Sequence, residues 1–371
     1  MKTRIPTIAV IATSLWVAYG VGMGSGTGHA MANTPSTSAA VAMSGHAGHT
    51  MTASEQVAHM ALAGDIHAGH ALEEMLRPAI QAAPSDPNLP ADDMGAATRL
   101  SSSSRRGEFT KVDVNGTPVN TWVVYPRGTA KKPVVIVIQE IFGLSDWIRA
   151  VADQLAAEGF IAVAPDLLSG HGPNGGDSSS FAGQTERTQA TLMLSPIEIA
   201  SRLKAVREWA LKLPNASAKN ATVGFCFGGN QSFAFAVNEP GLNAAVVYYG
   251  TAPTDVQPPS RSGAGGGNQA GGGGGQGGGP QNASPFVPSD RLAAIKAPIL
   301  GLYGGADPRI DATIPATEMK MKELGKVYEP HVFEGAGHGF LRAQTDNGGA
   351  NMKATLQAWS LTLSWLKRYT T

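Results

Sequence analysis

An apolar strand turns directly into a predicted helix at Ala221-Thr222-Val223-Gly224-Phe225-Cys226-Phe227-Gly228-Gly229. The pattern Gly-x-Cys-x-Gly is typical of a tight strand-to-helix turn that holds a nucleophile, and its small residues leave room for crowded backbone. Such a turn places the Cys226 side chain at the carboxyl end of a strand, beside a helix N-terminus. Because a helix dipole stabilises a thiolate, we expect a lowered thiol pKa. The alternative is a buried structural cysteine.

Apolar runs alternate with helix-like segments on both sides of this turn. Asn115-Gly116 indicates a hairpin between residues 108–114 and 120–125, and the β-branched run at 133–138 indicates a strand buried on both faces. Further strands are predicted at 160–164, 221–225, 244–249, 299–303 and 328–333, and helices at 145–158, 196–212, 228–237, 313–324 and 349–368. The alternation predicts an α/β domain with a mostly parallel, doubly wound sheet flanked by helices.

Two later glycine-rich loops carry an acid and a histidine. Asp307 lies in Gly304-Gly305-Ala306-Asp307-Pro308, after one predicted strand, and His338 lies in Gly335-Ala336-Gly337-His338-Gly339-Phe340, after the next. Taken singly, they are also compatible with a turn-forming acid and a loop histidine. The chain order nucleophile, acid, histidine is that of the α/β-hydrolase fold. The predicted catalytic triad is therefore Cys226, Asp307 and His338.

The predicted domain resembles the dienelactone hydrolases over about residues 107–368. The resemblance rests on the cysteine turn, on the acid and histidine loops, and on two further stretches, Gln139-Glu140-Ile141-Phe142-Gly143 and Pro165-Asp166-Leu167. It implies an α/β-hydrolase that cleaves a lactone or small carboxylic ester without a cofactor. It also implies that Cys226 is the nucleophile and forms a thioester, that His338 is the general base and then acid, and that Asp307 fixes the imidazole tautomer.

The same resemblance implies roles for residues outside the triad. Glu140 would interact with the nucleophilic thiol, and the backbone N–H groups of Phe227 and Ile141 would form the oxyanion hole. Arg342 would bind a substrate carboxylate, since a guanidinium suits bidentate pairing. Arg187 is a candidate for a second substrate-binding arginine. The alternative for Glu140 is a solvated acid at the end of a strand, and the alternative for Arg342 is a surface arginine.

The first residues have the pattern of a secretory signal peptide. Lys2 and Arg4 precede an apolar run over residues 5–21, and small residues follow up to Ala32. We therefore expect a signal peptide at 1–32, export to the periplasm or the medium, and no stable membrane insertion after cleavage. An uncleaved membrane anchor is the alternative.

Residues 33–106 have the composition of a flexible leader, and the hydrolase domain is expected at 107–371. Low apolar periodicity predicts that the leader is largely disordered, with short helices at about 53–63 and 69–77. A Gly-rich insertion at about 255–289 interrupts the domain and has linker composition. Low-complexity insertions of this kind are tolerated because loop-closure entropy grows slowly with length.

Histidine and methionine are concentrated in the leader. The pairs His46-x-x-His49 and His67-x-x-His70 are weak candidates for metal binding, since imidazole and thioether ligands suit ions such as copper. A passive low-complexity spacer is the alternative. A non-catalytic binding protein, built on the same scaffold with a metal-binding leader, is the second function that we consider.

The composition argues against nucleic-acid binding and excludes a disulfide within the chain. Lys plus Arg and Asp plus Glu are equal, at 28 each, so no net charge attracts a nucleic acid. The single cysteine, Cys226, excludes a disulfide within the chain. The expected partner is a small lactone or ester.

Overall fold

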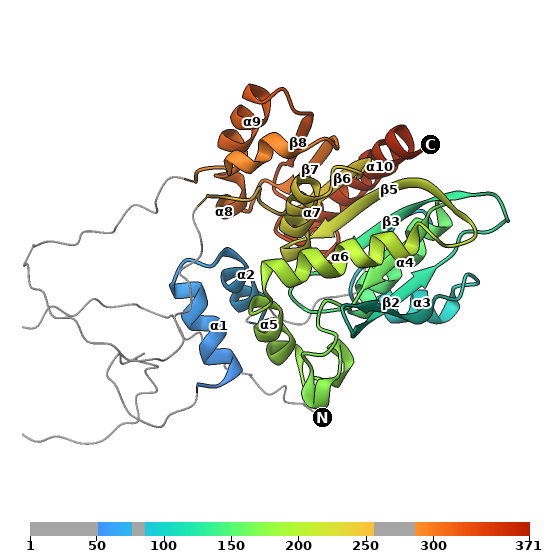
Figure 1. Cartoon of the computed structure of the whole chain (residues 1–371). Coiled ribbons are helices and arrows are strands. Elements are labelled where there is room, and N and C mark those ends of the chain that lie inside the picture. Colours follow the sequence, from blue (N-terminus) through green and yellow to red (C-terminus); the bar gives the residue numbers. More distant parts are fainter. Residues whose placement is uncertain (1–50, 76–85, 256–285) are drawn as a thin grey trace, which may run out of the picture. The chain divides into compact units, whose positions relative to one another are not determined.

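The computed structural model describes residues 51–75, 86–255 and 286–371 (Figure 1). The predicted signal peptide, His46, His49 and most of the Gly-rich insertion lie outside these residues. No helix within the described ranges is both long and apolar enough to cross a bilayer.

Eight strands form one mixed sheet in the order β1-β2-β4-β3-β5-β6-β7-β8. The strands are β1 Glu108–Val114, β2 Thr117–Val124, β3 Lys132–Ile138, β4 Ile161–Pro165, β5 Ala216–Phe225, β6 Ala244–Tyr248, β7 Ile299–Gly304 and β8 Tyr328–Phe333. The β1–β2 and β2–β4 pairs are antiparallel, and all other neighbours are parallel. This arrangement confirms the predicted α/β class and its mostly parallel sheet.

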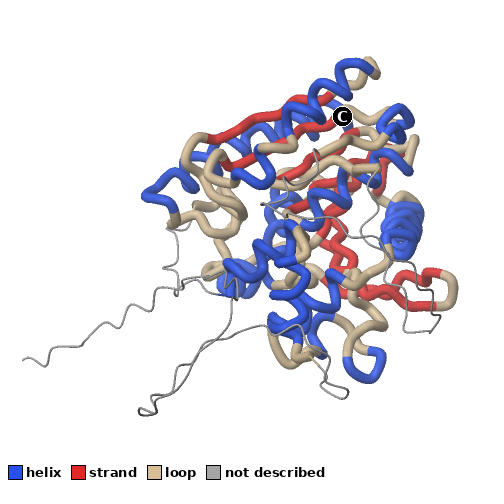
Figure 2. The backbone as a smooth tube through the Cα atoms, turned by 90° about the vertical axis from the view of Figure 1, so that its left-hand side faces the viewer, coloured by secondary structure: helices blue, strands red, loops and turns tan. Residues whose placement is uncertain are grey.

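Helices cover both faces of the sheet (Figures 1 and 2). The main ones are α4 Asp146–Ala157, α6 Pro196–Ala210, α7 Phe227–Asn238, α9 Ile314–Glu323 and α10 Ala350–Thr370. Three shorter helices, α3 Ala96–Ser102, α5 Gln184–Leu192 and α8 Pro308–Asp311, were not predicted from the sequence. Because parallel strands need crossover connections, the helices between β3 and β8 follow from the strand directions.

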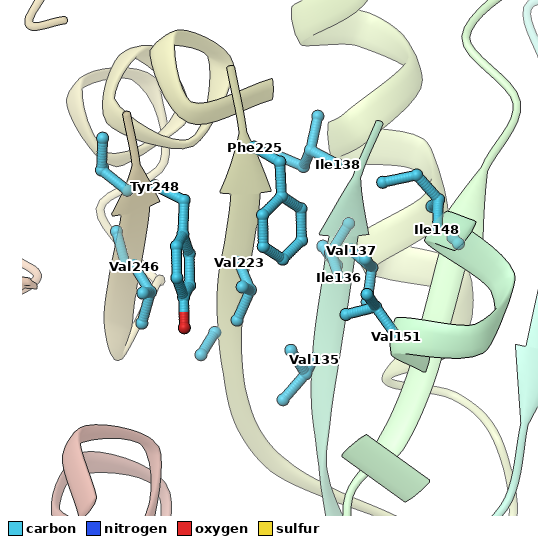
Figure 3. Close-up of a cluster of buried hydrophobic side chains, with 14 of the residues drawn as sticks. Val135, Ile136, Val137, Ile138, Ile148, Val151, Val223, Phe225, Val246 and Tyr248 are labelled. Carbon is cyan, nitrogen blue, oxygen red and sulfur yellow. The ribbon is translucent and has the colours of Figure 1, made fainter. Parts of the chain in front are cut away.

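The core lies along the central strands, where β-branched residues pack against helices (Figure 3). Val137 on β3 pairs with Val223 on β5, and both side chains are fully buried. Ile148 and Val151 of α4 are fully buried as well. A parallel strand buried on both faces needs this uninterrupted apolar sequence. This packing holds the central strands in place, and the site residues follow the carboxyl ends of the strands.

The described part of the leader differs from the disorder expected for it. Residues Ala53–Leu62 form α1 and Ile66–Met75 form α2, close to the two short helices that were expected. Thr52 and Glu55 form a capping box at the start of α1, and the Asp65 carboxylate accepts the Ala68 N–H at the start of α2. Helices this short are marginal alone, so tertiary packing must support them.

That packing joins the leader helices to the hydrolase domain. Val57 of α1 and Ala68 of α2 are fully buried. Both helices contact α5, and the Gln189 amide of α5 donates to the Gln56 side chain of α1 (Figure 1). The segment 51–75 is therefore part of the folded unit rather than a spacer before it.

Candidate active site

Cys226 occupies a strained turn between β5 and α7. Its φ of 56° and ψ of −118° are unusual for a residue with a side chain, and its N–H donates to the Tyr248 carbonyl at 3.0 Å. A Cβ on Gly224 would lie 1.9 Å from the Gly228 carbonyl oxygen, and one on Gly228 would lie 2.3 Å from the Ile138 oxygen. The glycines are therefore required by close backbone approach, as the motif predicts.

Asp307 and His338 come from neighbouring loops that are tied together by backbone hydrogen bonds. Asp307 follows β7 and His338 follows β8, and the Ala306 N–H donates to the Ala336 carbonyl at 2.8 Å. The Asn351 side chain accepts the Gly337 N–H at 2.9 Å and fixes the histidine loop from α10. His338 Nδ1 lies 2.6 Å from Asp307 Oδ2, so the acid and histidine predicted from the sequence form a pair.

The electrostatics of this pair suit a histidine base. Burial alone would raise the pKa of Asp307, but hydrogen bonds and charge from His338 and His70 outweigh it and lower the pKa. Burial, together with His70, lowers the pKa of His338 to about 3 against the pull of Asp307. The ring is thus neutral at pH 7, with its Nδ1 proton toward Asp307. Its Nε2 is buried and has no hydrogen-bond partner among the described residues, which leaves a lone pair for a proton.

The Cys226 sulfur forms a hydrogen bond with His67 of α2, a residue of the predicted leader. Sγ lies 3.6 Å from His67 Nδ1, and His67 Nε2 lies 2.6 Å from Asn230 Nδ2. Asn230 Oδ1 accepts the Thr251 N–H at 2.5 Å, so its amide nitrogen faces His67 and donates. His67 Nε2 is therefore the acceptor, and its Nδ1–H donates to the sulfur. A neutral His67 in this tautomer cannot take the thiol proton through Nδ1.

A second leader residue, His70, contacts the acid and the histidine. His70 Nε2 lies 3.1 Å from Asp307 Oδ1, on the carboxylate that also binds His338. The rings of His70 and His338 stack with centroids 3.5 Å apart and planes inclined by 17°. The sequence singled out His67 and His70 only as candidate metal ligands. Their place at this site depends on contacts across more than 150 residues, for which the sequence gives no signal.

The pKa of the Cys226 thiol differs from the expectation. Burial raises it well above its usual value, and the nearby Glu140 carboxylate raises it further. The Phe227 N–H and Arg342 act in the opposite direction but are outweighed. With Cys226 only 2% exposed, desolvation dominates over the helix N-terminus. In this closed arrangement the group is a thiol rather than a thiolate.

Glu140 and Arg342 form a buried ion pair near Cys226. Arg342 Nε lies 3.0 Å from Glu140 Oε2, and the guanidinium lies over the Phe142 ring, 5.0 Å from its centroid. Ile141, the second predicted oxyanion residue, follows Glu140 and is buried. Arg187, the second candidate arginine, lies on α5, and its buried Nε has no hydrogen-bond partner in the described ranges.

Tyr249 is a site residue that sequence reasoning missed. It follows β6, has a φ of 38°, and its ring centroid lies 5.0 Å from that of His338. Its buried hydroxyl has no hydrogen-bond partner within the described part of the chain. Burial, together with the charge of Glu140, raises its pKa well above the usual value. The hydroxyl is therefore neutral, on a ring that packs against His338.

Known proteins match most of this chain. The family model described as "Dienelactone hydrolase family" matches residues 119–370. An Escherichia coli (strain K12) protein named "Putative carboxymethylenebutenolidase" is 28% identical over 265 residues, covering 70% of this chain and 86% of its own. A protein of the same name from Methylorubrum extorquens is 29% identical over 240 residues, covering 64% and 72%.

Solved structures share the fold at lower identity. A "Putative Dienelactone Hydrolase" from Klebsiella pneumoniae aligns with a TM-score of 0.56 and 23% identity, over 71% of this chain and 99% of that one. A dienelactone hydrolase-like promiscuous phosphotriesterase from metagenomic libraries aligns with a TM-score of 0.54 and 18% identity, over 72% and 99%.

The sheet order, the strained cysteine turn and the acid–histidine pair at the carboxyl ends of the strands define an α/β-hydrolase. The match over residues 119–370 places the chain within that class: it belongs to the dienelactone hydrolase family. It is accordingly an enzyme of the lactone and carboxylic ester hydrolase class.

Proposed function

We propose that the enzyme opens a lactone or cleaves a small carboxylic ester through a thioester on Cys226. The supporting observation is the Asp307–His338 pair, whose hydrogen bond of 2.6 Å orients the unpartnered Nε2 as a base. Asp307 holds the proton on Nδ1 and stabilises the imidazolium that forms. The strained turn presents the sulfur at the carboxyl end of β5.

The reaction begins when α2 withdraws His67 from the sulfur. The Cys226 proton passes to His338 Nε2, and Sγ forms a bond to the substrate carbonyl carbon. The resulting oxyanion accepts hydrogen bonds from the N–H groups of Phe227 and Ile141. Each such donor stabilises the transition state by about 3–4 kcal/mol. The Phe227 N–H already faces the sulfur, in support of this assignment.

Collapse of the oxyanion breaks the carbon–oxygen bond of the substrate. The leaving oxygen takes the proton from His338, which opens a lactone ring or releases an alcohol. A water molecule then gives a proton to His338 and adds to the thioester carbonyl. Collapse of this second oxyanion returns the proton to the Cys226 sulfur and releases the carboxylic acid.

Arg342 is proposed to bind a carboxylate on the substrate. The buried Arg342–Glu140 pair leaves Glu140 able to turn toward the thiol when a substrate carboxylate takes its place. In that position the Glu140 carboxylate would accept a hydrogen bond from the thiol before the proton passes to His338. Arg187 is the candidate for a second contact with the substrate.

Trapping the intermediate tests the proposed reaction. Brief exposure of the protein to an activated aryl ester is expected to add one acyl group, which intact-mass spectrometry detects and peptide mapping locates at Cys226. Hydroxylamine will remove the group, since thioesters react with it readily. Cys226→Ala is expected to gain no acyl mass at the same ester concentration. A wild-type protein that hydrolyses the ester without passing through an adduct on Cys226 would contradict the mechanism.

Export is proposed on the basis of the first 32 residues. Their basic start, apolar run and small-residue end have signal-peptide character. Amino-terminal sequencing of the cell-fractionated protein is expected to find a mature chain in the periplasm or medium that begins near residue 33. An intact amino terminus in the cytosolic fraction would contradict export.

A further inference from the structure

We propose that His70, Asp307 and His338 together bind a divalent transition-metal ion of the zinc type, and that this ion holds α2 over the active site. The metal-binding part stands on these three residues alone. The inhibitory consequence rests on the proposed hydrolase mechanism, because the same Asp307 and His338 serve as acid and base there.

The three side chains have a spacing that one ion could bridge. One candidate ligand atom from each residue lies within 4.8 Å of the other two. His70 Nε2 lies 3.1 Å from one carboxylate oxygen of Asp307, and His338 Nδ1 lies 2.6 Å from the other. Zinc binds nitrogen and oxygen at about 2.0–2.2 Å, so two ligand atoms of a tetrahedral site are separated by about 3.4 Å. The widest pair therefore has to approach by up to about 1.4 Å, through rotation of the side chains.

The chemistry of the three groups matches zinc. Two imidazoles and one carboxylate are borderline ligands of the kind that bind zinc, and three protein ligands leave one coordination position open. His70 and His338 each direct a nitrogen at the Asp307 carboxylate. Binding of an ion would displace the Nδ1 proton of His338 and turn the two stacked rings so that the lone pairs of both meet the ion. Asp307 and His70 are both buried, so an ion there would be largely shielded from water.

The ligands come from two parts of the chain, so an ion would tie them together. His70 lies on α2, whereas Asp307 and His338 follow β7 and β8. His67, one helical turn before His70, lies 3.6 Å from the Cys226 sulfur. An ion on His70 would therefore keep His67 on the thiol and would also occupy the base and its acid. The expected result is reversible inhibition by zinc.

Zinc binding can be measured without turnover. Purified full-length protein is stripped with a chelator and dialysed against buffered Zn²⁺, and bound zinc is counted per chain. The Cys226→Ala variant should retain the site, which separates it from zinc bound by the thiol. His70→Ala is expected to weaken this binding by at least about 10-fold, because even loss of a group that only orients a ligand costs 10–100-fold in affinity.

Matched variants control for other histidines. His331→Ala removes an exposed imidazole of β8 that pairs with Glu329. The double variant His46→Ala/His49→Ala removes the other histidine pair of the leader. Both should bind zinc at this site with wild-type affinity. Equal zinc affinity in wild type and His70→Ala would overturn the proposed site, and so would loss of the site in the His46/His49 double variant.

Alkylation of Cys226, the only cysteine, reports whether the ion holds α2 in place. Zinc should slow alkylation of wild type, because an ion on His70 keeps His67 over the thiol, and a chelator should restore the rate. His70→Ala should show no such response. If zinc binds at the site without slowing alkylation, the proposal that the ion holds α2 over Cys226 is overturned. Because dialysis does not depend on catalysis, failure of the proposed hydrolase reaction would leave the metal result intact and distinguishable.

Discussion

Replacement of His338 by alanine is expected to lower kcat/KM for a lactone or aryl ester by about 10⁴-fold or more. The Asp307 carboxylate holds the Nδ1 proton of this ring, and Nε2 is left without a hydrogen-bond partner among the described residues. Burial raises the pKa of the Cys226 thiol, so the sulfur depends on a nearby base to lose its proton at neutral pH. Steady-state kinetics with a chromogenic ester measure the loss.

A double variant separates a catalytic unit from independent effects. Residues that act together are strongly non-additive, so Cys226→Ala/His338→Ala should be no slower than the slower single variant. His331→Ala, on the exposed part of β8, should retain wild-type activity. If His338→Ala keeps activity within 10-fold of wild type at unchanged thermal stability, the base is another residue. A 10-fold change in rate corresponds to about 1.4 kcal/mol in the activation barrier.

Replacement of Gly228 by alanine is expected to remove more than about 3 kcal/mol of the free energy of unfolding, or to prevent accumulation of folded protein. The added Cβ would lie 2.3 Å from the Ile138 carbonyl oxygen and 2.5 Å from that of Gln139. Both are backbone atoms: Ile138 is the last residue of β3 and pairs with Gly224 of β5, and Gln139 follows it directly, so the first cannot move without disturbing strand pairing. Urea unfolding and the yield of soluble protein measure the effect.

Gly325→Ala is the matched control for this substitution. Gly325 has a φ of +63° and no atom within 4 Å of an added Cβ, so only its backbone conformation opposes alanine. Its expected cost is about 1–2 kcal/mol. A similar loss of stability in both variants would mean that close backbone approach at the cysteine turn is not what excludes a side chain from position 228.

The elements that the sequence predicts well are those with a strong local pattern. The fully buried β3 and the strand before Cys226 have continuous apolar sequence, and the glycines of the turn have a specific steric role. Helix α5 was missed because its two fully buried residues are Thr188 and Thr191, so no apolar stripe marks it. A helix that is buried through threonines has no periodicity to detect.

The contents of the site were predicted only in part. The Asp307–His338 pair followed from motifs that each lie at the end of a strand. The position of α2 could not be predicted, because it depends on contacts between His67 and residues more than 150 positions away. The prediction that the Cys226 pKa is lowered was wrong for the same reason. That prediction took account only of the helix N-terminus next to Cys226. The pKa is raised by burial under segments that are distant in sequence.

The cover over Cys226 also bears on how long the enzyme survives. Oxidants attack an accessible thiolate first, and oxidation past the sulfenic acid stage is irreversible for nearly all proteins. A sulfur that is 2% exposed and kept protonated resists this damage. With no second cysteine to rescue an oxidised one as a disulfide, the chain relies on shielding. The resting enzyme is thus protected while idle, and under the proposed mechanism its reactivity is confined to the interval in which α2 withdraws His67 from the sulfur.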